Sequence, residues 1–401
     1  MTSRVVVIGS GIGGLTAAIA LHAEGHEVEV YDQAATFSAI GAGVALGANG
    51  SRLIDRLGLG PALREVGCDL QRIQFHDWRT GDMFYEHPMG DWYTGRFGAP
   101  FLGLHRADLH QVLLDAFRAG GGQVHLGKRC VTIDETPDEV GLTFADGTSV
   151  HADVVIGADG VRSTVRQHVA GPDEAVFAGM SCFRGLVPID KVPGGDMMGL
   201  TFFLGPISHL VVYPVRRGEL INFVAYTRDA AWTDESWSAT GDASQAVAAF
   251  DGFNDTVLTM LAAVEDTGRW ALFDREPLRQ WSTGRVTLLG DAAHPMLPHA
   301  GQGSNQAVED AAVLAHFLGR RDLPVSEALA AYETVRKPRA RQLQLGSRGN
   351  AKCFQVPDGP EAQARNERLT NLPDMVSWIH EYDAHADLRD RTTAQPETVA
   401  G

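Results

Sequence analysis

Residues 4–33, RVVVIGSGIGGLTAAIALHAEGHEVEVYDQ, contain the pattern that most constrains how this chain can fold. The continuous apolar run at 5–8 is typical of a parallel strand that is buried on both faces. The segment 15–23 has good helix formers and ends near a glycine, and 28–31 returns to an apolar strand pattern. We therefore predict a strand, a turn, a helix and a second strand in this order, as in a Rossmann-type unit.

The turn of this unit contains Gly9, Gly11 and Gly14 with the GxGxxG spacing. The first glycine allows the tight turn, the second lets a pyrophosphate approach the backbone, and the third lets the helix pack close to the strand. Asp32 follows the second strand, where an acidic side chain hydrogen-bonds a ribose hydroxyl. The neighbouring residues expected to line the same site are Ile12, Gly13 and Gln33. The pattern predicts dinucleotide binding without deciding between NAD and FAD.

Composition excludes several classes of protein. A chain of 401 residues predicts two packed domains or one large interrupted domain. The 34 basic and 50 acidic residues give a net charge of −16, which argues against a nucleic-acid surface. No apolar run approaches the roughly 20 residues that span a membrane, and the 4 cysteines form no CxxC pair for a redox or zinc site. We expect a cytoplasmic protein with no membrane span and no metal.

Two later stretches place charged residues where predicted helices begin. In GLHRADLHQ, Arg106 opens a helix and can pair with a phosphate, although an ordinary surface ion pair explains a lone arginine more simply. In VVIGADGVRSTVR, an apolar strand ends at Gly157, Asp159 and Gly160 form a turn, and Ser163 begins a helix. Taken alone, this second stretch is an ordinary joint between a strand and a helix.

Together with SAIGAGVALGANGSRLIDRLGL at 38–59, these stretches resemble, in the same order, the class A flavoprotein aromatic hydroxylases. The resemblance is strongest to salicylate hydroxylase and to the related 3-hydroxybenzoate and 6-hydroxynicotinate hydroxylases, and it extends to about residue 345. It implies FAD as the bound dinucleotide. It also implies NADH or NADPH as a transient co-substrate, which fits the absence of a second GxGxxG pattern.

The resemblance also implies roles for the charged residues. Arg106 is similar to the arginine that contacts FAD in this family. Asp159 and Gly160 form the family's DG motif, which contacts FAD and helps to engage the pyridine nucleotide. Arg162 and Arg166 are then candidates for the phosphates of either nucleotide.

A third stretch, GRVTLLGDAAHPMLPHAGQGSNQAVEDA, is interpreted in the same way. Its strand delivers Asp291 beside the ribityl chain, where a carboxylate can accept a hydrogen bond from a hydroxyl group. The helix that follows begins near the flavin, and its free amides favour the negative charge of the reduced ring. Small residues there keep side chains out of the way. The expected contacts of this segment, besides Asp291, are Gly301, Gln302, Gly303 and Ser304.

The resemblance implies an α/β fold: a Rossmann-type FAD-binding domain of the p-hydroxybenzoate hydroxylase fold, interrupted by a mostly antiparallel substrate sheet and followed by C-terminal helices. Alternating apolar runs between about 180 and 275 predict that sheet independently. The aromatic-rich residues 72–100 are expected to add strands or a loop. The expected boundaries are 1–71, 101–179 and 275–345 for the FAD-binding domain, 72–100 and 180–274 for the substrate domain, and 346–401 for a helical segment whose tail, TTAQPETVAG, is disordered.

In such an enzyme a flavin hydroperoxide attacks an electron-rich ring, so a base or hydrogen-bond acceptor is expected near the substrate phenol. His209 stands where similar hydroxylases have a histidine near that phenol, and Tyr213 shares its strand face by alternation. Pro298 and His299 are expected at the flavin edge. For each of these residues, simple packing is the alternative. Arg184 is expected to hold the joint between the domains rather than to bind a carboxylate.

The leading hypothesis is a single-component monooxygenase that hydroxylates a phenolic aromatic acid with NAD(P)H and dioxygen, acting as a monomer or homodimer. Two alternatives stay open: a hydroxylase or epoxidase that tailors a larger polyketide or quinolone, and an inactive flavin-binding protein. Ala45 stands where the 6-hydroxynicotinate enzymes have a histidine, and Pro298 where the 3-hydroxybenzoate enzymes have a glutamine. Both differences disfavour those two substrates.

Overall fold

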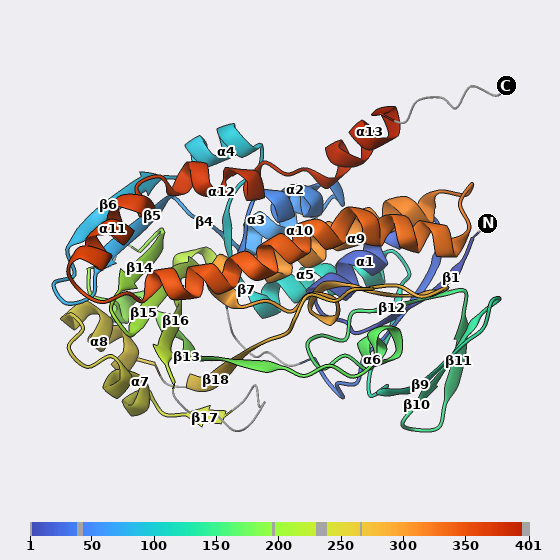
Figure 1. Cartoon of the computed structure of the whole chain (residues 1–401), viewed down its shortest axis with the longest axis horizontal. Helices are drawn as coiled ribbons and strands as arrows, with labels where there is room; N and C mark the ends of the chain where they lie inside the picture. Colours follow the sequence, from blue (N-terminus) through green and yellow to red (C-terminus); the bar gives the residue numbers. More distant parts are fainter. Residues whose placement is uncertain (1, 38–42, 195–196, 230–238, 265–266, 395–401) are drawn as a thin grey trace.

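The computed structural model describes residues 2–37, 43–194, 197–229, 239–264 and 267–394. Figure 1 shows two regions connected by one long helix, α10 (Val325–Phe354), which crosses the molecule. One end of α10 lies in the region that contains the N-terminus, and the other end lies beside a large sheet. The helix therefore contributes side chains to both regions.

A five-stranded parallel sheet forms the centre of the N-terminal region. Its strands, in spatial order, are β19 (Val286–Leu288), β12 (Val154–Gly157), β1 (Arg4–Ile8), β2 (Glu27–Tyr31) and β8 (Gln123–His125). The valines of β1 are completely buried, as the apolar run predicts for a strand covered on both faces. The helices that share this core are α1 (Ile12–Ala23), α5 (Arg106–Ala119) and α9 (Gly303–Gly319). The predicted α/β fold class is confirmed.

Two small antiparallel sheets and three short helices complete this region. One sheet contains β11 (Ser149–Ala152), β10 (Val140–Phe144) and β9 (Cys130–Glu135). The other contains β3 (Gly43–Leu46), β7 (Leu102–His105) and β4 (Cys68–Asp69). The short helices are α2 (Ala48–Arg56), α3 (Gly60–Val66) and α6 (Thr164–Ala170).

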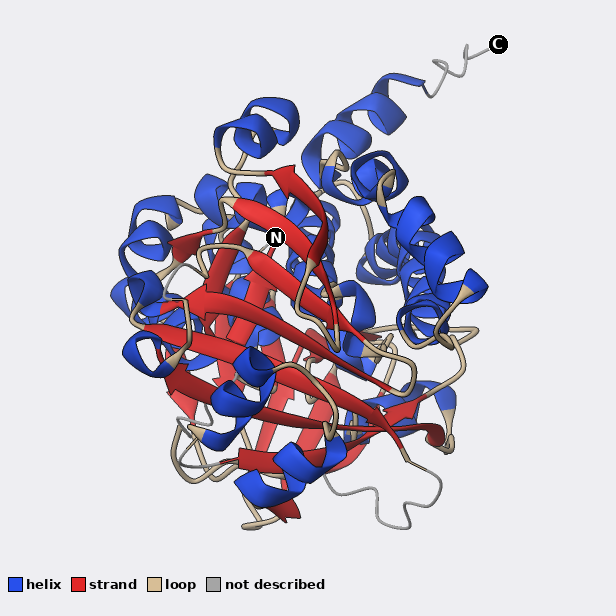
Figure 2. Ribbon diagram, turned by 90° about the vertical axis from the view of Figure 1, so that its left-hand side faces the viewer, coloured by secondary structure: helices blue, strands red, loops and turns tan. Residues whose placement is uncertain are grey.

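The second region is built on an eight-stranded sheet, whose strands form the twisted stack of Figure 2. The strands, in spatial order, are β17 (Ala239–Gly241), β18 (Thr267–Asp274), β13 (Val176–Pro188), β16 (Leu220–Arg228), β15 (Ser208–Val215), β14 (Leu200–Leu204), β5 (Arg72–Asp77) and β6 (Met83–Pro88). Only the pair β14–β5 is parallel among these strands. The mostly antiparallel sheet is therefore confirmed.

The aromatic-rich stretch before residue 100 differs in part from the expectation of strands or a loop. It contributes β5 and β6, but Asp91–Phe97 form a helix, α4. Gly90 and Gly98, with φ of 51° and 75°, bound this helix in backbone conformations that favour glycine. The helix forms because two of its aromatic residues, Tyr93 and Phe97, can then be buried on one side.

The large sheet buries different kinds of side chain on its two faces. Its outer face carries Phe183, Leu210 and Phe223, which pack against α7 (Ala243–Ala249) and α8 (Asp255–Ala262). Alternation places the intervening residues on the inner face. That face is covered by Ala351 of α10 and by Leu297, and it carries most of the polar groups discussed below.

The chain ends in α11 (Pro360–Leu369), α12 (Leu372–His380) and α13 (Ala384–Ala394). Residues 395–401 of the tail expected to be disordered lie outside the described residues, whereas 392–394 belong to α13. Leu369 and Leu372 pack with residues of β5 and β14. Within the described ranges, no helix combines the length and apolarity that a membrane span requires.

A completely buried ion cluster joins the helices around α9. Arg336 of α10 donates to Glu309 at 2.6 Å and to Asp310 at 2.8 Å, and all three side chains are 0% exposed. Asp310 also bonds His294 at 2.6 Å, and Glu309 accepts a hydrogen bond from Asn49 of α2 at 2.7 Å. We call these five residues the Arg336 cluster. Burial alone would raise the pKa of Asp310, but His294 and Arg336 lower it to about 2, so the carboxylate stays ionised.

We expect Arg336→Ala to lower the free energy of unfolding by about 3–5 kcal/mol, because the buried Asp310 loses its arginine and the buried Glu309 keeps only Arg339 as a cationic partner. Urea denaturation followed by circular dichroism measures this difference. Arg320→Ala is the matched control, since its ion pair with Asp322 is exposed and screened by water. Equal stability of the two variants would contradict the structural role of the Arg336 cluster.

Candidate functional site

The glycine turn between β1 and α1 has the geometry that its sequence predicts. Gly9 has a φ of 107°, which only glycine adopts readily. A Cβ atom on Gly14 would come within 2.0 Å of the Gly9 carbonyl oxygen, so the helix packs directly on the turn. A Cβ atom on Gly11 would meet nothing within 4 Å. The space above Gly11 can therefore admit a ligand's phosphate to the backbone.

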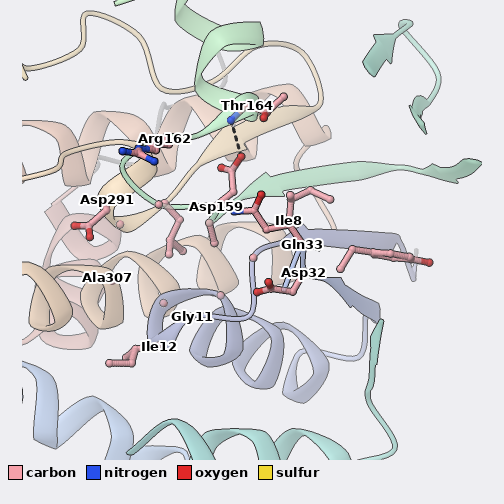
Figure 3. Close-up of a pocket in the computed structure, with 18 of the residues that line it drawn as sticks. Ile8, Gly11, Ile12, Asp32, Gln33, Asp159, Arg162, Thr164, Asp291 and Ala307 are labelled. Atoms are coloured by element: carbon pink, nitrogen blue, oxygen red, sulfur yellow. Dashed lines mark hydrogen bonds between the residues drawn. The ribbon is translucent and has the colours of Figure 1, made fainter. Parts of the chain in front are cut away.

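An elongated pocket opens above this turn, at the carboxyl ends of β1, β2, β12 and β19 and the start of α9. In Figure 3, Asp291 and Asp32 lie on opposite sides of this pocket, with Gly11 between them. The predicted cofactor residues that line it are Gly9, Gly11, Ile12, Gly13, Gly14, Asp32, Gln33, Arg106, Asp159, Gly160, Arg162, Asp291, Gly303 and Ser304. Segments far apart in the sequence thus meet in one site.

Three candidates do not line this pocket. Gly301 ends the short turn η4 (Pro298–Ala300). Gln302 is 3% exposed, and its side-chain oxygen accepts hydrogen bonds from neighbouring amides. Arg166 is 2% exposed and forms an ion pair with Asp173 at 3.2 Å. Their observed contacts are internal to the protein.

Two acidic residues of the pocket also hold its backbone. The carboxylate of Asp159 caps α6 by accepting a hydrogen bond from the Thr164 amide at 2.7 Å (Figure 3). The carboxylate of Asp32 accepts bonds from the amide and the hydroxyl of Ser10, at 2.7 and 2.6 Å. Asp32 therefore anchors the turn between β1 and α1, in addition to facing the pocket.

Asp291 has a different environment. It stands in the turn η3 (Gly290–Ala292) directly after β19, and its side chain is open to the pocket. The surrounding protein raises its pKa by desolvation, which His294, Arg106 and Arg166 offset in part. Its carboxylate forms no ion pair with any described residue. It is therefore available to a hydroxyl group of a bound ligand.

The basic residues of the pocket suit a pyrophosphate. They are Arg106, Lys128, Arg129 and Arg162. Arg106 is exposed at the first turn of α5 and forms no ion pair within the part of the chain that the structure describes. Lys128 is paired with Asp146 at 2.6 Å. Sequence reasoning missed Lys128 and Arg129, although two adjacent basic residues shortly after the strand β8 could have indicated a site for an anion.

The predicted substrate residues lie on the inner face of the large sheet and on η4. His209 and Tyr226 are register partners on β15 and β16, and their rings stack with centroids 4.5 Å apart. The ring of His299, from η4, lies 4.6 Å from Tyr226 and 5.6 Å from His209. Pro298 precedes His299 as the first residue of η4. His299 precedes Gly303, which lines the nucleotide pocket, by only four residues.

Tyr213 shares the inner face with His209 but lies farther along β15. Its register partner is Asn222, and both side chains approach Gly43 of β3. The side-chain oxygen of Asn222 accepts a hydrogen bond from the Gly43 amide at 2.6 Å. Burial raises the pKa of Tyr213, so its hydroxyl stays protonated. Tyr213 therefore lies on the same inner face of the large sheet as His209, next to β3.

The hydrogen bonds of His209 decide which ring nitrogen carries its proton. The side-chain amide of Gln355 lies 3.1 Å from Nδ1 of His209 and donates to the Tyr226 carbonyl at 3.4 Å. Its nitrogen therefore faces Nδ1, which accepts, so the proton of the neutral ring lies on Nε2. Burial, assisted by His299 and Arg365, lowers the pKa of His209 well below its usual value. With this tautomer, the neutral ring of His209 can donate a hydrogen bond from Nε2.

Nε2 of His209 is buried and has no hydrogen-bond partner among the described residues. Both ring nitrogens of His299 are also buried without a hydrogen-bond partner among the described residues. Burial, together with the charge of Arg184, lowers the pKa of His299 to about 3. Buried polar groups normally have partners, so these unpaired atoms indicate a ligand. Sequence reasoning missed Tyr226 and Gln355, because only the sheet register and the end of α10 bring them to His209.

Comparison with known proteins gives one family. A family model described as an FAD binding domain matches residues 2–346. A 3-amino-4-hydroxybenzoate 2-monooxygenase from Streptomyces platensis is 41% identical over 384 residues, covering 95% of this chain and 96% of that protein. A solved salicylate hydroxylase–substrate complex has a TM-score of 0.84 and 30% identity, covering 100% and 99% of the two chains. HpxO from Klebsiella pneumoniae, solved with FAD and uric acid, has a TM-score of 0.82 and 30% identity, covering 96% and 95%.

The fold and the cationic pocket above the glycine turn define a dinucleotide-binding protein of the Rossmann type. More particularly, the chain belongs to the FAD binding domain family and, within it, to the class A flavoprotein monooxygenases. FAD is its cofactor, and NAD(P)H is the co-substrate typical of these enzymes. The pocket fits FAD, since open space over Gly11 and an unpaired Arg106 can receive the pyrophosphate and Asp291 can receive a ribityl hydroxyl.

We expect Gly11→Ala to fold normally but to lose most of its FAD affinity. The new methyl group clashes with no protein atom, and the φ of −67° suits alanine, but the group occupies the space of the phosphate. Fluorescence titration of the apoprotein with FAD, together with a thermal melt, measures both properties. Gly14→Ala is the matched comparison and should instead destabilise the fold, because its Cβ atom overlaps the Gly9 carbonyl. Tight FAD binding by Gly11→Ala would contradict the assignment.

Proposed function

We propose that this flavoprotein hydroxylates a phenolic aromatic acid, and that amino- or hydroxy-substituted benzoates are its substrate class. One oxygen atom of dioxygen enters the ring, the other leaves as water, and NAD(P)H is oxidised. The similarity to enzymes named 3-amino-4-hydroxybenzoate 2-monooxygenase, at 38–41% identity, supports this choice of ring. We further propose that the enzyme acts as a monomer or homodimer in the cytoplasm, where NAD(P)H is available.

The observation that carries the proposal is the unpaired Nε2–H group of His209 on the inner face of the large sheet. A neutral donor in a buried site stabilises an oxygen that bears negative charge. A phenolate is such a group, and its electron-rich ring is the form that reacts with activated dioxygen. Bound FAD would pass the two electrons of NAD(P)H to dioxygen and so activate it.

The residues around His209 have supporting roles in this proposal. Gln355 holds the proton of His209 on Nε2, and Tyr226 orients the imidazole by stacking on it. Val211 and Val224, neighbours on the same face, present an apolar surface to the ring of the substrate. His299 links this wall to the start of α9 beside the FAD pocket.

We expect the purified, FAD-loaded enzyme to oxidise NAD(P)H at least about tenfold faster when 3-amino-4-hydroxybenzoate is present, with formation of a hydroxylated product. Salicylate and the hydroxybenzoates complete the test panel. We include 6-hydroxynicotinate as a negative member, because Ala45 replaces the expected histidine. Chromatography of the products separates hydroxylation from peroxide release. If no aromatic acid on the panel stimulates oxidation, the proposed function is wrong.

We expect His209→Phe to raise the pKa of a bound phenol by about 1–2 units, because a hydrogen bond to a charged oxygen contributes about 1.5–3 kcal/mol. Ultraviolet difference spectra of the bound ligand against pH measure this pKa.

His209→Asn, whose amide can still donate, is the control and should give the smaller shift. A bound phenol whose pKa is the same in wild-type and in His209→Phe would show that His209 does not contact the phenol. Substrate-stimulated NAD(P)H oxidation of the same variants then tests whether the donor also matters for turnover.

A further inference from the structure

The inner face of the large sheet carries a cation without an acidic partner. Arg184 lies on β13, and its side chain is half-buried. No carboxylate among the described residues pairs with it, and its buried Nε atom has no hydrogen-bond partner. The guanidinium contacts the Cys182 thiol and lies 6.0 Å from the ring centroid of Trp270. An enclosed cation without a counterion is costly, so this site indicates an anion that comes from outside the chain.

The strand register places Arg184 on the same wall as the phenol site. Arg184 pairs with Val224 of β16, and Val224 pairs with Val211 of β15. Paired residues share a face, so these three side chains form one row across the inner face. His209 belongs to the adjacent row on β15 and is separated from β13 by one intervening strand. Two strand spacings separate the two positions by about 10 Å across the strands, and the offset of one row adds about 7 Å along them.

The groups around Arg184 cannot neutralise it. Burial raises the pKa values of Tyr213 and Tyr226, so both phenols stay protonated beside the guanidinium. His299 is also close enough for Arg184 to lower its pKa, and it is neutral as well. Neutral hydroxyl groups next to a guanidinium are donors for the oxygens of a carboxylate.

The two apolar side chains between Arg184 and His209, Val224 and Val211, suit contact with a flat aromatic ring. Val224 is 8% exposed, and Val211 keeps some accessible surface although residues around it are fully buried. Leu297, from the segment before η4, and Ala351 of α10 pack on the same side of the sheet. The partly exposed side chain of Val211 therefore lies on the side of the sheet that Leu297 and Ala351 cover.

We propose that Arg184 binds the carboxylate of the aromatic substrate, at the opposite end of the Val211–Val224 row from the phenol-binding His209. This inference rests on the proposed function and deepens it, because it makes the carboxylate a requirement of binding. It also reverses the expectation from sequence that Arg184 only holds the joint between domains. The enzyme then selects aromatic acids over neutral phenols of the same shape, and it disfavours large neutral polyketides.

The experiment compares two ligands that differ only in the carboxylate, 3-amino-4-hydroxybenzoate and 2-aminophenol. Changes in the absorbance of the bound flavin report the Kd of each ligand for the FAD-loaded protein. We expect Arg184→Met to weaken binding of the acid by about 10–150-fold and to change the Kd of 2-aminophenol less than threefold. Arg184→Lys, which keeps a cation without the planar fork, should give an intermediate loss for the acid.

Arg269→Met is the matched control, because Arg269 lies on the neighbouring strand opposite Phe183 and pairs with Asp229 on the outer face. It should leave the ratio of the two Kd values unchanged. Equal weakening of both ligands by Arg184→Met, or no weakening of the acid, overturns the proposal for Arg184.

The outcomes also separate this inference from the proposed function. If the acid stimulates NAD(P)H oxidation in the wild-type enzyme and Arg184→Met binds it as tightly, only the carboxylate site is wrong. If the wild-type enzyme responds to 2-aminophenol but to no aromatic acid, hydroxylation of a phenol stands and the carboxylate site is wrong. If neither ligand binds or stimulates the wild-type enzyme, both proposals are wrong.

Discussion

The Arg336 cluster is the constraint on which both candidate sites depend. Arg336 of α10 holds two successive carboxylates of α9, and Asp310 also accepts a hydrogen bond from the amide of Gly290 at 3.0 Å. Gly290 precedes Asp291, which faces the FAD pocket. The same ion pairs therefore position the start of α9, the turn that presents Asp291 and the axis of α10. Burying them requires nearly ideal geometry, since the desolvation of each ion is otherwise uncompensated.

The long helix α10 connects the Arg336 cluster to the inner face of the large sheet, where the proposed substrate residues lie. Its first half carries Arg336, and its end carries Ala351 and Phe354 against the large sheet. Gln355 follows directly and sets the tautomer of His209. A change in the Arg336 cluster can therefore alter substrate binding without any contact with the substrate. The FAD pocket and the proposed phenol site are therefore connected through α10.

The two sites use charge in opposite ways. The FAD pocket collects basic side chains around open space, which suits a ligand that carries two phosphates. The substrate wall is made of neutral polar groups, because burial keeps the tyrosines protonated and the histidines neutral. Arg184 forms no ion pair with a carboxylate of the described residues, and the proposed substrate would supply one.

Local sequence was sufficient for the glycine turn of the nucleotide-binding half. The spacing of Gly9, Gly11 and Gly14 and the order of strand, helix and strand follow from steric limits within a few residues, so they could be predicted and were found. The resemblance to the flavoprotein hydroxylases predicted Arg106, Asp159 and Asp291, and all three line the pocket. Gly301, Gln302 and Arg166 were expected on the same resemblance, but they do not line this pocket, and Gln302 and Arg166 instead contact other groups of the protein.

The substrate wall could not be worked out in this way, because strand register and helix ends are set by contacts between distant segments. The sequence by itself determined the alternation that puts His209 and Tyr213 on one face of β15. Only the tertiary structure decided that Tyr226 stacks on His209, that Gln355 places its proton on Nε2, and that no carboxylate of the described residues pairs with Arg184. A side chain's proton and charge depend on the groups around it in space, and those groups come from parts of the chain that are more than a hundred residues apart.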